Sequence, residues 1–176
     1  MAHQTTPTDV PPSTRSADLL FRSPDLSDGG GMWRVARDSR TLDLNSSYTY
    51  LLFARDFAAT SRVAISEGEV VGFVIGYLRP EASDRLFVWQ IAVDQSQRGR
   101  GVAARLLEAL LADLSQVRHL ETTITEDNAA SQRLFASLAE RHEAGHEIEP
   151  LMRAEDFPDD HDAEHLHIIG ALNARA

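Results

Sequence analysis

The hydrophobic and polar positions along the chain predict strands and helices in alternation. A short apolar segment at 19–22 predicts a first strand. The glycines at 29–31 predict a flexible joint before a helix over 32–40. A second helix is expected over about 46–56, where polar N-cap residues precede an apolar periodic segment. The first part of the chain should therefore contribute one strand and two helices.

Three apolar segments in the middle of the chain predict neighbouring strands. Those at 61–66 and 70–78 are joined by the turn 67–69 and are expected to form a hairpin. The segment 85–93 is apolar at almost every position, which predicts a central strand buried on both faces. A glycine-rich turn follows, and an amphipathic helix with leucines on one face is expected over 102–115.

The remaining segments predict two more strands and one more helix. A strand is expected over 119–125, a helix over 129–141, an acidic loop over 149–164 and a last short strand over 165–171. This order of elements predicts an α/β fold in which a mixed β-sheet is flanked by helices on both faces.

Length and composition favour one globular domain after a short tail. The chain has 176 residues and a mass of 19.5 kDa, which suits one hydrophobic core, and 43% of its residues are apolar. Residues 1–16 are rich in Thr, Pro and Ser and are expected to be disordered. We therefore expect a tail over 1–16 and a single domain over 17–176.

The charged residues and the lack of cysteine narrow the class of function. The formal net charge of −10 argues against nucleic acid and anionic membranes as partners. The sequence has no cysteine and all 17 basic residues are arginines, which excludes thiolate chemistry, a lysine Schiff base and a P-loop. No apolar segment approaches the roughly 20 residues that span a bilayer, and no secretory signal pattern is found. A cytoplasmic location is therefore expected.

The segment 97–103 lies between the predicted buried strand and the leucine-faced helix. Gly99 and Gly101 permit a tight turn and a close approach of the backbone to a ligand. The helix that follows offers N–H groups and the positive end of its dipole, which suit a pyrophosphate, and Arg98 and Arg100 could add charge-assisted contacts. The competing interpretation is an ordinary strand-to-helix turn. The spacing of a dinucleotide-binding G-x-G-x-x-G motif is absent.

Two motifs in this part of the chain resemble the GNAT superfamily of acetyltransferases. Arg98-x-x-Gly101-x-Ala103 matches the superfamily's cofactor turn, and Asn128-Ala129-Ala130-Ser131 resembles its second cofactor segment. The resemblance implies a GNAT-like sheet, acetyl-CoA as co-substrate and no metal. The residues it implies for the coenzyme are Ile91, Ala92 and Val93 for the pantetheine arm, Arg98, Gly99, Arg100, Gly101, Val102 and Ala103 for the pyrophosphate, and the side chains of Asn128 and Ser131. For Asn128 and Ser131 the competing interpretation is helix capping.

Three longer segments resemble a narrower family, the L-2,4-diaminobutyrate acetyltransferases of ectoine biosynthesis. They are TLDLNSSY at 41–48, FVWQIAV at 87–93 and ETTIT at 121–125, and the similarity spans about residues 17–170. The resemblance implies transfer of acetyl from acetyl-CoA to the 4-amino group of L-2,4-diaminobutyrate. It also implies a homodimer.

Candidate substrate residues follow from the charges of diaminobutyrate. The molecule carries two ammonium groups and one carboxylate at neutral pH, so its pocket needs anions and hydrogen-bond acceptors. Asp43 is a candidate ligand of an ammonium group, or it begins a turn. Tyr48 could offer its hydroxyl to the substrate, or it packs in the core. Trp89 could line the pocket and stack against an ammonium group, or it belongs to the core.

The segment 159–167 concentrates ionisable side chains and allows three interpretations. It is a solvated acidic loop, or it binds a metal through His161, His165 and His167, or it closes over the substrate. The family resemblance favours closure, with His161 and Glu164 in contact with the substrate. The metal site is the least favoured, because acetyl transfer from a thioester needs no Lewis acid.

The reaction expected from these residues is direct attack by the amine in a ternary complex, without an acyl-enzyme. The ammonium group must first lose a proton. Glu164 is the first candidate base, with Asp43 and His161 behind it. A backbone amide of the strand segment 91–93 would stabilise the oxyanion.

Two questions stay open at the level of sequence. Phe135 stands where many GNAT members have a tyrosine that protonates the leaving thiolate. Tyr48 or Tyr77 could replace that tyrosine, or the thiolate leaves unassisted. The function also has alternatives: acetylation of another small amine or of a protein N-terminus, and a non-catalytic module that binds a CoA ester.

Overall fold

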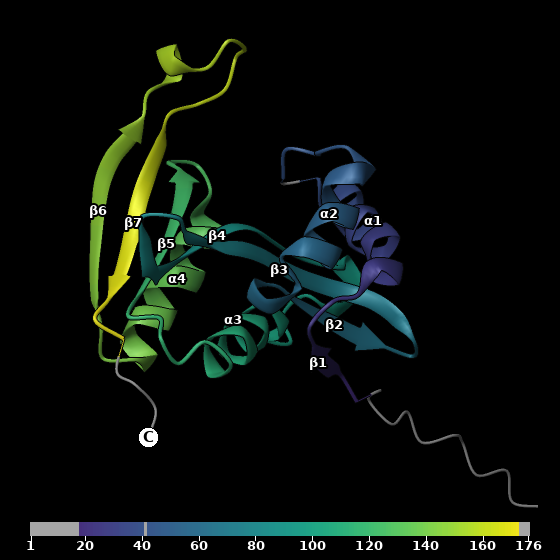
Figure 1. Cartoon of the computed structure of the whole chain (residues 1–176). Coiled ribbons are helices and arrows are strands. Elements are labelled where there is room, and N and C mark those ends of the chain that lie inside the picture. Colours follow the sequence, from purple (N-terminus) through teal and green to yellow (C-terminus); the bar gives the residue numbers. More distant parts are fainter. Residues whose placement is uncertain (1–17, 41, 173–176) are drawn as a thin grey trace, which may run out of the picture.

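The computed structural model describes residues 18–40 and 42–172, which build one seven-stranded β-sheet with α-helices around it (Figure 1). The strand order across the sheet is β1-β2-β3-β4-β5-β7-β6. Neighbouring strands are antiparallel except β4 and β5, which are parallel. The prediction of an α/β fold with a mixed sheet is confirmed. The predicted tail over 1–16 lies outside the described residues.

The elements have the following bounds. The strands are β1 (Leu20–Arg22), β2 (Arg62–Ser66), β3 (Glu69–Arg79), β4 (Ala82–Val93), β5 (His119–Thr125), β6 (Gly145–Met152) and β7 (Glu164–Gly170). The α-helices are α1 (Gly29–Ser39), α2 (Ser47–Asp56), α3 (Val102–Ala112) and α4 (Ala129–Arg141), and short 3-10 helices lie at Leu26–Asp28, Ala58–Thr60, Gln95–Gln97 and Ala154–Asp156. Among residues 18–40 and 42–172, every helix is too short or too polar to span a bilayer.

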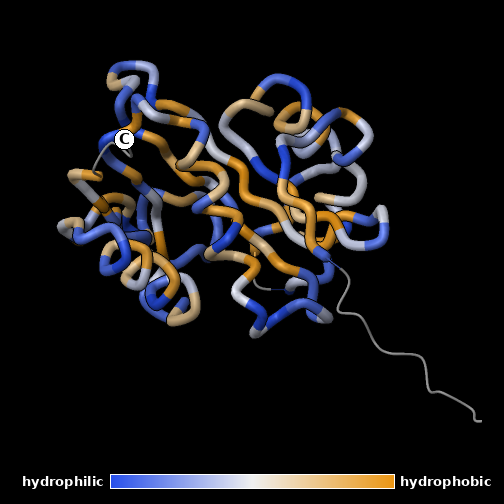
Figure 2. The backbone as a smooth tube through the Cα atoms, turned by 90° about the horizontal axis from the view of Figure 1, so that it is seen from below, coloured by the Kyte–Doolittle hydropathy of each residue, from blue (hydrophilic) through white to orange (hydrophobic). Residues whose placement is uncertain are grey.

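Each face of the sheet is covered by one pair of helices with its own hydrophobic core. On one face α1 and α2 bring side chains such as Met32 and Tyr50 against β2, β3 and the end of β4. On the other face α3 packs side chains such as Leu106 against β2, β3 and β4, and α4 packs side chains such as Leu138 toward β6 and β7. Figure 2 shows the hydrophobic residues concentrated along the central strands and the hydrophilic residues at the periphery. The prediction that helices flank both faces is confirmed.

A β-bulge in β4 turns two consecutive side chains toward α2. In the pairing of β3 with β4, Val88 and Gln90 have partners and Trp89 between them is the extra residue. Trp89 and Gln90 both contact α2, through Phe53 and Tyr50 respectively. Neighbouring side chains of a regular strand point to opposite faces, so the bulge is what brings this pair to one side.

Strands β4 and β5 are paired over three positions only. Their parallel register ends at Phe87 opposite Glu121, although both strands continue beyond this point. Glu121 is 1% exposed, and its carboxylate accepts hydrogen bonds from the guanidinium groups of Arg79 and Arg85. These contacts join β3, β4 and β5 at the point where the sheet opens.

Two sequence predictions about the first half of the chain were wrong. The glycines at 29–31 form the first turn of α1, not a flexible joint. The 3-10 helix before them is anchored, because the Asp28 carboxylate accepts hydrogen bonds from Arg22 at 2.6 Å and from the Asp25 N–H at 2.8 Å. Strand β4 is not buried on both faces, since Trp89 is 40% exposed beyond the point where β5 diverges.

Two predictions about the second half need correction as well. Strand β6 occupies part of the expected loop at 149–164 and pairs with β7 along its length. It escaped prediction because it is an edge strand with mostly exposed side chains, which need no apolar pattern. Helix α3 ends at Ala112, before the expected end at residue 115, and Leu114 packs in the core from the following turn.

Gly76 is expected to tolerate no side chain. A Cβ at this position would lie 2.5 Å from the carbonyl oxygen of Phe87, a backbone atom of the neighbouring strand. We expect Gly76→Ala to lower the free energy of unfolding by about 2 kcal/mol, because the strands must shift to make room. A Cβ at Gly30, in the first turn of α1, would meet nothing within 4 Å. Gly30→Ala should therefore raise this free energy by about 0.5 kcal/mol. Urea unfolding measures both, and equal stabilities of the two variants would contradict the described strand pairing.

Candidate active site

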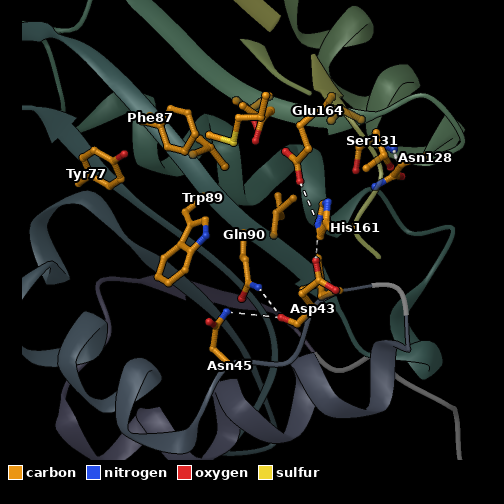
Figure 3. A pocket seen from close by; sticks show the side chains of 18 of the residues that line it. Asp43, Asn45, Tyr77, Phe87, Trp89, Gln90, Asn128, Ser131, His161 and Glu164 are labelled. Atoms are coloured by element: carbon orange, nitrogen blue, oxygen red, sulfur yellow. Dashed lines mark hydrogen bonds and ion pairs between the residues drawn. The ribbon is translucent and has the colours of Figure 1, made fainter. Parts of the chain in front are cut away.

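A pocket of about 1000 Å³ opens where β4 and β5 diverge (Figure 3). Its lining comes from β3, β4, β5, α2, α4, the segment before α2, the end of β6, the start of β7 and the segment between these two strands. From β5, the threonines and isoleucine of 122–125 face it, beyond the last position paired with β4. Backbone groups along this part of β4 therefore border a cavity instead of a neighbouring strand.

Three ionisable side chains meet in the pocket, and Figure 3 shows His161 between Glu164 and Asp43. The Nε2 atom of His161 lies 3.0 Å from Oδ2 of Asp43 and 3.6 Å from Oε1 of Glu164. Its Nδ1 donates to the carbonyl oxygen of Asp162 at 2.7 Å, and Phe157 stacks on its ring with centroids 4.2 Å apart. Because Nδ1 must donate to a carbonyl, Nε2 can donate to the carboxylates only when the ring is an imidazolium.

The surroundings of His161 raise its pKa above the ordinary value of 6.5. The largest cause is the hydrogen bond to the Asp162 carbonyl. The hydrogen bond and charge of Asp43 and the charge of Glu164 act in the same direction, while burial opposes them. In its protonated form the ring therefore balances the charge of two carboxylates that line the pocket.

Aromatic side chains form another part of the wall. The ring of Trp89 lies 5.0 Å from that of Phe53, and Phe53 stacks on Phe57 at 4.7 Å. Tyr77 and Phe87 make a second pair, with ring centroids 5.3 Å apart. Since Trp89 is 40% exposed and lines the pocket, its ring is accessible to a cationic group.

The turn before α3 is open and has a backbone shape that favours glycine. Gly99 and Gly101 have φ angles of 74° and 70°, and nothing lies within 4 Å of the place where a Cβ would be. Gly101 is the N-cap residue of α3, and no side chain caps the helix there. The Arg98 guanidinium donates to the Ser39 carbonyl at 3.2 Å and so ties the turn to the end of α1. An uncapped helix start beside open space suits an anionic ligand.

The structure divides the predicted site residues into two groups. Those that line the pocket are Asp43, Trp89, Ile91, Asn128, Ser131, His161 and Glu164. Those outside its lining are Tyr48, Ala92, Val93, Arg98, Gly99, Arg100, Gly101, Val102 and Ala103. Tyr48 is 65% exposed on α2. Asn128 caps α4, because its Oδ1 accepts the Ser131 N–H at 3.1 Å. Capping, the competing interpretation of these two residues, is therefore present, and both still face the pocket.

The three histidines considered as metal ligands are not gathered into one site. Within 18–40 and 42–172, no group of three or more histidine and acidic side chains is arranged to hold a metal ion. His161 faces the pocket, whereas His167 is 4% exposed and hydrogen-bonded to His146 at 3.0 Å.

Sequence reasoning missed several residues of the pocket, among them Gln90 and Asn45. Gln90 is 6% exposed, and its side chain donates to the main-chain carbonyl of Asp43 at 2.9 Å. Asn45 donates to the same carbonyl at 3.4 Å. A polar residue inside an apolar strand was the available signal for Gln90, because a buried amide must find partners.

The comparisons with known proteins place the chain in a family. The sequence pattern of the Acetyltransferase (GNAT) family matches residues 31–139. The chain belongs to the GNAT acetyltransferases. Within them it is similar to the L-2,4-diaminobutyric acid acetyltransferase of Streptomyces avermitilis, with 53% identity over 160 residues that cover 88% of this chain and 89% of the relative.

Solved structures agree with this placement. The diaminobutyrate acetyltransferase EctA from Paenibacillus lautus, in complex with L-2,4-diaminobutyric acid and coenzyme A, matches with a TM-score of 0.86 and 36% identity. The match covers 92% of this chain and 99% of that chain. The ribosomal-protein-S18-alanine N-acetyltransferase from Escherichia coli has a TM-score of 0.64 and 20% identity, over 90% of this chain and 96% of that chain. The second likeness concerns the fold alone.

The raised pKa of His161 should depend on Asp43. We expect Asp43→Asn to lower the pKa of His161 toward 6.5, because the neutral amide no longer favours the imidazolium. NMR titration of the ring protons measures this. His167 is the internal control, since burial, helped by the neighbouring His146, lowers its pKa without contact with Asp43.

The same shift predicts how stability depends on pH. A raised pKa in the folded state means that the ion pairs of His161 stabilise the fold below about pH 6.5, and that this contribution fades as pH rises through the raised value. In the NMR titration, an unchanged pKa of His161 in Asp43→Asn would contradict the described contact between His161 and Asp43.

Proposed function

We propose that this chain transfers the acetyl group of acetyl-CoA to the 4-amino group of L-2,4-diaminobutyrate, the reaction of ectoine biosynthesis. The observation that carries the proposal is the meeting of Asp43, His161 and Glu164 in a pocket between diverging strands. Two carboxylates that line one pocket suit a substrate with two ammonium groups. Identity of 53% to an L-2,4-diaminobutyric acid acetyltransferase supports this choice of substrate.

The residues around the opening of the sheet fit coenzyme A. Acetyl-CoA supplies an acetyl thioester. The backbone of Ile91, Ala92 and Val93 continues β4 past its last pairing with β5, so its free edge suits the amides of the pantetheine arm. The turn over 98–103 presents amides and the start of α3, which suit the pyrophosphate. Asn128 and Ser131, at the start of α4, would contact the coenzyme from the other side of the opening.

Asp43 and Glu164 have different surroundings, which favours different roles. The Asp43 side chain is 86% exposed and the Glu164 side chain is 19% exposed. We assign Asp43 to binding of an ammonium group and Glu164 to removal of the proton from the 4-ammonium group, because Glu164 is the more enclosed of the two carboxylates that line the pocket. His161 holds both carboxylates in place. Trp89 faces the cation with its ring.

The bond changes need no acyl-enzyme. Glu164 takes the first ammonium proton and passes it to solvent, and the 4-amino nitrogen then attacks the thioester carbon. As the tetrahedral intermediate collapses, the C–S bond breaks and the second proton of the nitrogen ends on the departing sulfur, so the products are the amide and the free thiol. A backbone amide of the β4 segment 91–93 stabilises the oxyanion. Phe135 lines the pocket and cannot donate a proton to the thiolate. Tyr77 lines the pocket as well, while Tyr48 lies outside the lining, so Tyr77 is the better candidate donor.

We further propose one cytoplasmic domain over 17–176 that forms a homodimer. A single sheet runs from β1 to β7, which supports one domain. Strand β6 is an edge of this sheet, and its Ile148, Leu151 and Met152 are 58%, 49% and 38% exposed. Exposed apolar side chains on an edge strand suit contact with a second copy.

Turnover with a panel of amines tests the proposed reaction. We expect kcat/KM for diaminobutyrate to exceed that for ornithine by about tenfold or more, because ornithine has one more methylene than the pocket is shaped for. Lysine and a peptide with a free N-terminus should be poorer still. Thiol release measures the rate, and NMR of the product identifies the acetylated nitrogen. Preference for the peptide would contradict the proposal, and coenzyme A binding without turnover of any amine would favour a non-catalytic module.

Removal of the pocket carboxylates tests their roles. We expect Glu164→Gln to lower kcat with diaminobutyrate by about 100-fold, since an amide cannot accept the ammonium proton. Asp43→Asn should raise the KM for diaminobutyrate by about tenfold, the effect of losing one charged contact. Calorimetry should find coenzyme A binding unchanged in both. Asp160→Asn, an exposed acid of the same segment, is the matched control. Unchanged kinetics in the first two variants would remove both residues from the site.

A further inference from the structure

Asp43 is held in place through its main chain, by a hydrogen-bonded chain that starts in the core. The Tyr50 hydroxyl, on α2, donates to Oε1 of Gln90 at 2.9 Å, and Nε2 of Gln90 donates to the Asp43 carbonyl at 2.9 Å. Tyr50 is fully buried and Gln90 is 6% exposed. Figure 3 shows the Gln90 and Asn45 amides directed to Asp43 from the side of the sheet and α2.

The chemistry of the groups fixes the direction of this chain. A main-chain carbonyl only accepts hydrogen bonds, so the NH₂ end of Gln90 must face Asp43. The Oε1 end must then accept from Tyr50. Burial raises the pKa of Tyr50, so its hydroxyl keeps the proton that it donates. Both ends of the Gln90 amide are therefore used: Nε2 donates to the Asp43 carbonyl, and Oε1 accepts from the Tyr50 hydroxyl.

The bulge in β4 makes the chain possible. Trp89 and Gln90 both face α2 because Trp89 is inserted at the bulge. Trp89 therefore lines the aromatic wall of the pocket, while Gln90 reaches the loop before α2. The carboxylate of Asp43 points away from this anchor, to His161 at 3.0 Å.

We propose that Gln90, supported by Tyr50, is the positioning residue that sets the Asp43 carboxylate for binding of the diamine. The inference rests on the proposed function. A strand residue whose side-chain oxygen and nitrogen both form hydrogen bonds is a rigid support. The loop over 42–46, in contrast, has no regular secondary structure of its own. Loss of the support lets the loop move, so that Asp43 meets the ammonium group in a smaller fraction of molecules.

Kinetics of Gln90→Leu and Tyr50→Phe test the proposal. We expect Gln90→Leu to raise the KM for diaminobutyrate about tenfold, with smaller effects on kcat and on the KM for acetyl-CoA. Tyr50→Phe should raise the same KM about threefold, and the double variant should lie close to Gln90→Leu alone, because the hydroxyl acts through Gln90. Gln116→Leu, at an exposed glutamine outside the site, is the matched control. If Gln90 had a purely structural role, Gln90→Leu would lower the free energy of unfolding but would not raise the KM for diaminobutyrate more than the KM for acetyl-CoA.

Hydrogen–deuterium exchange of the segment 42–46 gives a readout that does not need turnover. Faster exchange in Gln90→Leu than in wild type and Gln116→Leu is the expected result. Unchanged exchange, or faster exchange with an unchanged KM for diaminobutyrate, would overturn the positioning role. If the wild-type chain acetylates no diaminobutyrate, the proposed function fails separately, and exchange at 42–46 decides whether Gln90 holds the loop.

Discussion

The separation of β4 from β5 is the constraint on which the site depends. Parallel strands normally satisfy each other's backbone groups, and here the pairing stops at Phe87 and Glu121 while both strands continue. The buried carboxylate of Glu121, held by two arginines, keeps the strands together at that last position. Beyond it the free backbone edge of β4 is open to a ligand that can replace a strand. A pantetheine arm, with its amide groups, has the required chemistry.

For the proposed reaction, the pocket at this opening has to reconcile binding of an ammonium group with its deprotonation. A carboxylate that binds an ammonium group stabilises its charged form and so makes deprotonation harder. Separate carboxylates in separate surroundings reduce the conflict, because Asp43 is largely exposed and Glu164 is mostly covered. His161 contacts both carboxylates, and its protonated form would place a positive charge close to the charge that the substrate would bring.

The two sides of the pocket belong to different parts of the fold and are held in different ways. Asp43 lies in the loop before α2 and is anchored to β4 through Gln90. His161 and Glu164 lie at the end of the long β6–β7 hairpin, where Phe157 and the Asp162 carbonyl fix the imidazole ring. Figure 1 shows this hairpin extending beyond the body of the sheet. The contact of His161 with Asp43 joins these two parts.

The sequence by itself determined the features that depend on local backbone and periodic burial. Leucines at helical spacing gave α3, and Gly99 and Gly101 marked a turn whose φ angles only glycine adopts readily. Family motifs pointed to the coenzyme turn and to Asp43, His161 and Glu164. Tertiary structure alone decided the rest: the edge strand β6, the bulge at Trp89 and the contact of residues 118 positions apart. Register, bulges and contacts between distant segments depend on how whole elements pack, and no local pattern encodes them.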